Sequence, residues 1–231
     1  MHFLYPMGRG SRWDDNELRY SLRSIEKNCP NPEVTIAGYC PRWAKNVQHV
    51  PFNPLDGTKI SREYCAMLGA LPYVPNEFVF CNDDFYVMQS LTEMPLYHQG
   101  SLRQIIKYAL MDNPTGEDLY TQARQKTLDV LQEYCKEPLD YDIHVPMPLL
   151  RDMVYNTASL FPFWDGMQFR TIYGNITGGQ GEQIDDVKDI LGAAFLSTGS
   201  TVSDPLKNYL QAAFPEPCRF ERSVPHNLVV T

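Results

Sequence analysis

The chain has 231 residues, of which 43% are hydrophobic and 12% aromatic, enough to build one buried core, so we expect a single domain over residues 1–231. Its 28 Asp and Glu residues outnumber the 20 Lys and Arg residues, which argues against duplex DNA as a bulk electrostatic partner. No run of about 18 apolar residues could span a membrane, no signal-peptide pattern is present, and the six cysteines show no metal-ligand spacing, so we expect a cytoplasmic protein.

The first third of the chain alternates strand and helix patterns. An apolar run at residues 3–5 is followed by the glycine loop Gly8-Arg9-Gly10-Ser11-Arg12 and by a helix that begins near Asp14 and ends at Pro30. Further strands are expected at residues 34–38 and 46–50, and an amphipathic helix at residues 60–71. This alternation predicts an α/β fold with a sheet rich in parallel strands.

The next strand ends in a polar motif. Residues 78–81 form a short unbroken apolar run, which predicts a strand buried on both faces, and Asn82, Asp83 and Asp84 follow it directly. Ligands of open α/β sheets gather outside the carboxyl ends of strands. Two carboxylates there offer the hard oxygen ligands that Mg²⁺ and Mn²⁺ prefer, and such an ion would screen the diphosphate of a nucleotide sugar. The alternative is that the motif only forms a turn.

The second half of the chain adds helices. Residues 102–111 and 117–135 have helical patterns separated by a clear break, which predicts an inserted helical cap over about 101–138. The strand pattern resumes at residues 143–146, and a helix is expected near 149–159. A loop rich in Gly, Asn and Thr at residues 173–181 is typical of a segment near a site, and a last helix is expected at 204–213.

Two arginine pairs near the N-terminus are candidates for phosphate binding. Arg9 and Arg12 of the glycine loop could donate charge-assisted hydrogen bonds, although the loop could equally be an ordinary strand-to-helix turn. Arg19 and Arg23 lie four residues apart and share one helix face, where surface arginines are usually solvated.

Two further candidates come from the second half. His144 stands between apolar residues near a predicted strand end, where it could act as a general base or acid near neutral pH, or be a core residue. Arg170 could bind a phosphate or pair with a carboxylate. Periodicity does not separate these interpretations.

Several segments resemble a known family. Residues 12–27, RWDDNELRYSLRSIEK, resemble the second conserved region of the Stealth proteins, the sugar-1-phosphate transferases of bacterial capsule synthesis and lysosomal targeting. Residues 78–85, FVFCNDDF, resemble the strand and Asn-Asp-Asp signature of that family, and residues 144–148, HVPMP, resemble its third region. Phe169-Arg170 and residues 214–221 are similar to later parts. The resemblance covers most of the chain in the order of the family.

This resemblance implies a glycosyltransferase-A-like nucleotide-binding sheet flanked by helices, with Mg²⁺ or Mn²⁺ at Asp83 and Asp84. It implies His144, Asp84 and Arg170 as catalytic residues, His144 being the candidate base. It also moves Arg19 and Arg23 toward the site. With the arginines of the glycine loop, the predicted substrate-binding residues are Arg9, Arg12, Asn16, Arg19, Arg23 and Asn82. Where the first region of the family reads Trp-Val-Asp-Gly, this chain has Met7-Gly8-Arg9-Gly10-Ser11 and no acid.

The sequence therefore predicts a metal-dependent transferase that moves sugar-1-phosphate from a nucleotide-sugar donor to an acceptor with a free hydroxyl, such as a glycan or a nucleobase. The first alternative keeps the site but attacks the anomeric carbon, which makes the protein a glycosyltransferase. The second is a non-catalytic module that binds a sugar or nucleotide. The sequence leaves the acceptor and the transferred group open.

Overall fold

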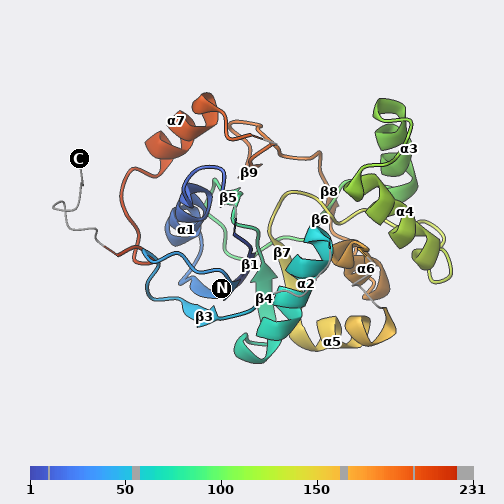
Figure 1. The fold of residues 1–231 in the computed structure, drawn as a ribbon, viewed down its shortest axis with the longest axis horizontal. Coiled ribbons are helices and arrows are strands. Elements are labelled where there is room, and N and C mark those ends of the chain that lie inside the picture. The colour runs from blue at the N-terminus through green and yellow to red at the C-terminus, as the bar shows by residue number, and fades with distance from the viewer. Residues whose placement is uncertain (10, 54–57, 162–165, 200, 223–231) are drawn as a thin grey trace.

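A five-stranded sheet forms the middle of the protein in the computed structural model, which describes residues 1–9, 11–53, 58–161, 166–199 and 201–222 (Figure 1). The strand order is β3 (Gln48–Val50), β2 (Glu33–Gly38), β1 (His2–Met7), β4 (Glu77–Phe80) and β7 (Met147–Leu150). The pairings from β3 through β4 are parallel, and β7 pairs with β4 in the antiparallel direction. The predicted parallel-rich sheet is therefore confirmed.

Helices cover both faces of this sheet, because successive residues of a strand point to opposite sides. Phe3 and Tyr5 of β1 belong to the core beneath α1, whereas Leu4 belongs to the core on the other face. In β4, Val79 belongs to the core beneath α1 and Phe80 to the core on the other face. This confirms that β4 is buried on both faces. The covering helices are α1 (Asn16–Asn28) on one face and α2 (Lys59–Ala70), α5 (Arg151–Leu160) and α6 (Phe169–Ile176) on the other (Figure 1).

Shorter elements surround the sheet. Two small sheets pair β5 (Phe85–Val87) with β9 (Phe195–Ser197) and β6 (Tyr97–His98) with β8 (Glu182–Gln183). The 3-10 helix η1 (Leu71–Tyr73) follows α2, and α7 (Asp204–Ala213) packs over β5 and β9 in a third apolar cluster. The helices α3 (Leu102–Asp112) and α4 (Leu119–Leu131) pack together at one end of the molecule (Figure 1).

Small polar side chains join α1 to β5. The Ser21 hydroxyl donates to the carbonyl oxygen of Phe85 at 2.6 Å, and the Asn28 amide donates to that of Val87 at 2.6 Å. The Val87 N–H donates to the Ser24 hydroxyl at 3.0 Å. These bonds fix α1 alongside β5, and the side of its first turn that carries Glu17 is the side near Asp83, which precedes β5.

Two expectations for the second half are corrected and one is confirmed. The strand expected at residues 143–146 begins only at Met147, because Arg170 binds the carbonyl oxygens of Ile143 and Val145, groups that a strand ladder would use. The helix expected near residues 149–159 is present as α5, Arg151–Leu160. The loop expected over residues 173–181 begins inside α6, whose apolar residues face the core.

The segment expected to be an inserted cap, residues 101–138, contains α3 and α4. How the chain divides into domains stays a prediction. Among the helices within the described residues, none is both long enough and apolar enough to cross a bilayer.

Candidate functional site

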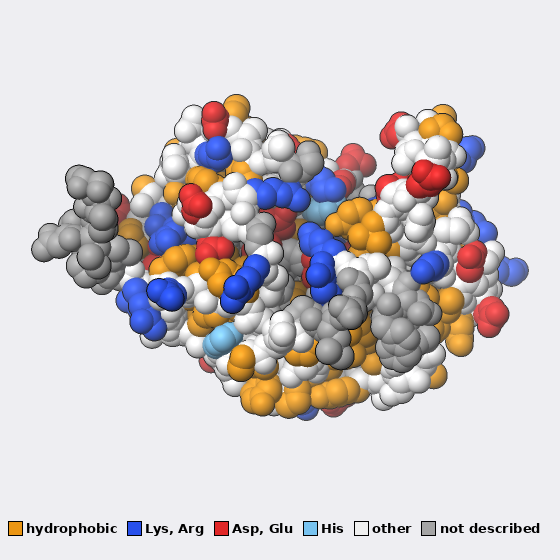
Figure 2. Space-filling view, viewed as in Figure 1, with side chains coloured by type: hydrophobic (Ala, Val, Ile, Leu, Met, Phe, Trp, Pro, Cys, Tyr) orange, Lys and Arg blue, Asp and Glu red, His pale blue; other side chains and the backbone are white. Residues whose placement is uncertain are grey.

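The Asn82-Asp83-Asp84 motif leaves the sheet directly after β4, at its carboxyl edge. Asp84 accepts a hydrogen bond of 2.8 Å from the hydroxyl of Thr198, which follows β9. The Oδ1 atom of Asn82 is buried and has no hydrogen-bond partner within the described residues. Because an unsatisfied buried amide oxygen is costly, it favours a ligand at this position. Figure 2 shows acidic, basic and histidine side chains together in the middle of this face.

The charge around Asp83 is strongly negative. Burial, followed by the charges of Asp84 and Glu17, raises the pKa of Asp83 to about 7. Two carboxylates in such surroundings disfavour double ionisation. A cation held between them would remove this repulsion.

This repulsion leads to a prediction about stability. Because its pKa is raised, the protonated Asp83 contributes to the free energy of unfolding. This contribution is fully present below pH 3.8, the ordinary pKa of an aspartate, and is lost as the pH rises through about 7. We therefore expect Asp83→Asn, in chelator, to raise the Tm at pH 8 and to change it little at pH 4. Calorimetry at both pH values checks this, with Asp112→Asn on the exposed end of α3 as the control. A lower Tm of the Asp83 variant at pH 8 would contradict it.

Glu17 fixes the loop between β1 and α1 beside the motif. Its carboxylate is almost fully buried and accepts hydrogen bonds from the Ser11 hydroxyl at 2.6 Å and from the Arg12 N–H at 2.8 Å. The Arg12 guanidinium in turn donates to the carbonyl oxygen of Gly199 at 2.9 Å. Gly199 follows Thr198, the partner of Asp84, so Arg12 is placed near the motif.

The other arginine of this loop stays on the surface. Arg9 is exposed, and its guanidinium lies 5.8 Å from the ring centre of Tyr39. The Tyr39 hydroxyl donates to Asp15 at 2.9 Å, and both Asp14 and Asp15 have left-handed backbones, with φ of 52° and 59°. This turn leads the chain into α1. The phosphate-binding role of Arg9 stays a prediction.

The first turn of α2 brings a lysine to the site. The Nζ atom of Lys59 lies 3.6 Å from Glu63 of the same helix. Burial lowers the pKa of Lys59, but Glu63, Tyr120 and the two aspartates of the motif raise it overall. Lys59 is therefore a cation within electrostatic range of Asp83 and Asp84.

His144 has a carboxylate partner. Its Nδ1 atom lies 2.9 Å from one carboxylate oxygen of Asp186 and 3.0 Å from the other. The ring meets Phe85, the residue after Asp84, edge-on, with 6.1 Å between centroids. Burial raises the pKa of Asp186, but the hydrogen bond and charge of His144 lower it overall. With Nδ1 held by Asp186, Nε2 is the nitrogen left to exchange a proton, which is the arrangement of a base with an orienting carboxylate.

Arg170 is buried and supports the segment that carries His144. It binds Asp142 through two nitrogens, at 3.0 and 2.5 Å, and donates to the carbonyl oxygen of Ile143 at 2.7 Å. Burial raises the pKa of Asp142, but the charge of Arg170 leads the effects that lower it overall. Of the two interpretations of Arg170, pairing with a carboxylate is confirmed by its ion pair with Asp142. A role of Arg170 toward a phosphate stays a prediction.

Arg19 and Arg23 bind the C-terminal segment, from the face of α1 opposite to β5. Arg23 reaches the two carboxylate oxygens of Glu221 at 2.6 and 2.9 Å, and Arg19 reaches one of them at 2.5 Å. Asn16 accepts a hydrogen bond of 3.0 Å from Arg19. The structure does not bring these three residues together with the motif, and their roles in substrate binding stay predictions.

The Glu221 cluster gives a second stability prediction. Burial raises the pKa of Glu221, but hydrogen bonds from Arg23, Cys218 and Arg19 lower it from 4.5 to about 2. Glu221→Gln should lower the free energy of unfolding by about 3 kcal/mol at pH 7, because it leaves two half-buried guanidinium groups without their counter-charge. Urea unfolding of the variant measures this loss.

The pH dependence has a defined sign. Because the pKa of Glu221 is lowered, its carboxylate contributes stability above pH 4.5, and this contribution disappears as the pH falls toward 2. The difference in the free energy of unfolding between wild type and Glu221→Gln should therefore shrink over that window. The exposed neighbour Glu216 offers a matched control as Glu216→Gln. Equal effects of the two substitutions would show that the cluster contributes nothing.

Sequence reasoning missed five residues of the site: Glu17, Lys59, Glu63, Asp186 and Thr198. Lys59 and Glu63 lie four residues apart on a predicted helix, a spacing that could have drawn attention to them. Asp186 follows a glycine-rich segment as the second residue of an Asp-Asp pair, as Asp84 does in its motif. Thr198 had no sequence signal.

Solved structures with a similar fold are known. The galactosyltransferase LgtC, in complex with donor and acceptor sugar analogs, superposes with a TM-score of 0.51 at 12% identity, covering 98% of each chain. An active-site mutant of LgtC gives a TM-score of 0.50 with the same identity and coverage. The protein has a glycosyltransferase-A fold. Mouse xyloside xylosyltransferase 1 is less similar, with a TM-score of 0.37 at 9% identity over 95% of both chains. No family model matches the sequence, and no curated protein matches it.

The motif of this glycosyltransferase-A fold suits a hard divalent cation. Asp83 and Asp84 supply carboxylate oxygens, and Asn82 Oδ1 is buried without a partner within the described residues. In the same ranges, no three His, Cys, Asp or Glu side chains converge closely enough to hold an ion by themselves. Two carboxylates and an amide oxygen are a suitable donor set for such an ion, because protein Mg²⁺ sites often use one or two carboxylates and complete the shell with water and substrate phosphates.

Proposed function

We propose that the protein is a transferase that uses a nucleotide-activated sugar and moves sugar-1-phosphate to an acceptor hydroxyl. The observation that carries this proposal is the placement of an acidic motif and a histidine–carboxylate pair around Phe85, at the carboxyl edge of the sheet in a glycosyltransferase-A fold. The sequence resemblance to the Stealth family supports phosphate transfer in particular.

The donor diphosphate would bind beside the motif. Asp83 and Asp84, with the Asn82 amide oxygen, would hold Mg²⁺ or Mn²⁺, which supplies positive charge against the diphosphate when bound. Lys59 and Arg12, near the motif in the structure, would add hydrogen bonds to phosphate oxygens. Arg9, Arg19, Arg23 and Arg170 are further proposed phosphate ligands; in this structure the last three are bound to carboxylates.

The chemical step would be carried by His144. Its Nε2 takes the proton of the acceptor hydroxyl while the acceptor oxygen forms a bond to the phosphorus next to the sugar. The bond between that phosphorus and the oxygen bridging to the nucleotide breaks, and a nucleoside monophosphate leaves. Asp186 holds the ring and stabilises the imidazolium that forms, and Arg170 holds the segment on which His144 stands.

One observation favours a second candidate function. The superposed structure LgtC is described as a galactosyltransferase, so the same site could instead direct the acceptor oxygen at the anomeric carbon. The product would then be a glycoside and the released group a nucleoside diphosphate.

The released nucleotide separates these functions. We would incubate the protein with Mn²⁺, a panel of nucleotide sugars and hydroxyl acceptors, and identify the nucleotide product by chromatography and mass spectrometry. A monophosphate together with a phosphodiester product supports the proposal. A diphosphate supports glycosyl transfer, and a nucleotide sugar that stays bound without turnover supports a binding module.

A further inference from the structure

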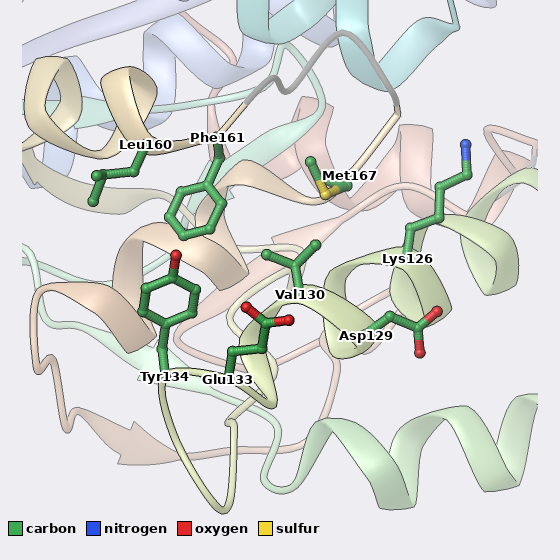
Figure 3. Close-up of a pocket in the computed structure, with 8 residues that line it drawn as sticks. All are labelled: Lys126, Asp129, Val130, Glu133, Tyr134, Leu160, Phe161 and Met167. Carbon is green, nitrogen blue, oxygen red and sulfur yellow. The ribbon is translucent and has the colours of Figure 1, made fainter.

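A cavity of about 510 Å³ opens on the helical end of the molecule, and Asp83 and Asp84 are not among the residues that line it. It lies between α4 and the end of α5, and Figure 3 shows its lining. Its lining consists of Lys126, Asp129, Val130, Glu133, Tyr134, Leu160, Phe161 and Met167. This volume falls within the usual range for small-molecule sites, about 300–1,000 Å³.

The lining combines an apolar floor with a polar rim. Phe161 is buried, and Tyr134 meets it edge-on with 5.4 Å between ring centroids while remaining 55% exposed. Leu160, 58% exposed, adds apolar surface at the same opening. An aromatic ring that is half exposed at the mouth of a cavity offers an apolar face with a polar hydroxyl at its edge.

The rim comes from α4 and the turn that follows it. Lys126 and Asp129 are three residues apart in α4 and share a helix face, and Glu133 lies just after the end of α4 at Leu131. Two carboxylates and one ammonium group give this rim a net negative charge, which disfavours phosphate and acidic ligands. The same groups can accept hydrogen bonds from hydroxyl groups and donate to them.

The helix α4 also connects the cavity with the proposed donor site. Tyr120, in its first turn, is one of the groups that raise the pKa of Lys59, as Asp83 and Asp84 are. From Tyr120 to Val130 the helix rises about 15 Å. A ligand in the cavity would thus lie about 15 Å along α4 from Tyr120, the residue of this helix whose charge reaches Lys59.

We propose that this cavity binds a neutral saccharide, as the part of an extended glycan acceptor that lies away from the reacting hydroxyl. The hydroxyl groups of the sugar bond to Asp129, Glu133 and Lys126, and its C–H face packs on Tyr134 and Leu160. This inference rests on the proposed function, since it assigns the acceptor class of the same enzyme.

The test measures saccharide binding separately from donor binding. Neutral and acidic oligosaccharides would be titrated by saturation-transfer NMR against wild type, Tyr134→Ala and Glu133→Gln, and a nucleotide sugar with Mn²⁺ would be titrated against the same proteins by calorimetry. Tyr73→Ala removes a tyrosine that is 52% exposed in η1 and is the matched control. Thermal melting confirms that each variant is folded, and Glu133→Gln replaces Tyr134→Ala if the latter is not.

We expect wild type to bind a neutral saccharide, Tyr134→Ala to weaken this binding about tenfold or more, and Tyr73→Ala to leave it unchanged. Donor affinity should be equal in all four proteins. No binding of neutral saccharides at millimolar concentration, a preference for acidic glycans or peptides, or binding unaffected in Tyr134→Ala and Glu133→Gln would overturn the inference. A wild type that binds saccharide at the cavity but no nucleotide sugar would instead refute the proposed function.

Discussion

Replacing His144 with alanine should lower turnover by a factor of about 10² to 10⁴ while the affinity for the donor stays near that of wild type. An acceptor hydroxyl is a poor nucleophile until a base takes its proton, and Nδ1 of His144 is held 2.9 Å from Asp186, which leaves Nε2 for this task. Turnover, donor affinity and Tm, measured on one preparation, distinguish loss of a base from loss of packing.

The pH profile adds an independent readout. The wild-type rate should have an acid limb, because a protonated base takes no proton from the acceptor, and this limb should vanish in His144→Ala. His49→Ala is the matched control, because the His49 side chain is exposed on β3 and hydrogen-bonds the carbonyl oxygen of Gly38. A His144 variant with a lowered Tm and a full rate per folded molecule would end the assignment as a base.

Replacing Asp83 and Asp84 together by asparagine should weaken metal-dependent donor binding and lower turnover by a factor on the order of 10³, since a bound ion contributes several kcal/mol of charge stabilisation. The fold should survive, because burial and mutual repulsion already disfavour the charged form of Asp83. Titration of a nucleotide sugar with and without Mn²⁺, followed by turnover at saturating donor, measures both effects.

The control for this pair removes the same amount of charge elsewhere. Asp112 and Asp152 are exposed, at the end of α3 and the start of α5, and their double asparagine variant should bind donor as wild type does. Undiminished turnover of wild type in excess chelator, or of the Asp83 and Asp84 double variant, would remove the metal from the mechanism.

Local patterns were enough to predict much of the fold. The helix expected at residues 204–213 coincides with α7, and the apolar run at 78–81 is a strand buried on both faces. Such patterns work because periodicity reports which side of an element is buried. They failed at residues 143–146, where a tertiary contact from Arg170 replaces the strand ladder.

The candidate site depended more on tertiary structure. The sequence by itself placed Asn82, Asp83 and Asp84 at the carboxyl end of a buried strand, because the strand pattern ends there. Only the tertiary structure decided that His144 pairs with Asp186, 42 residues later, and that Asp84 pairs with Thr198, 114 residues later. It also decided that Arg19 and Arg23 bind Glu221. The physical reason is that periodicity describes one element at a time, whereas these contacts arise from how separate elements pack, and packing overrides local preference.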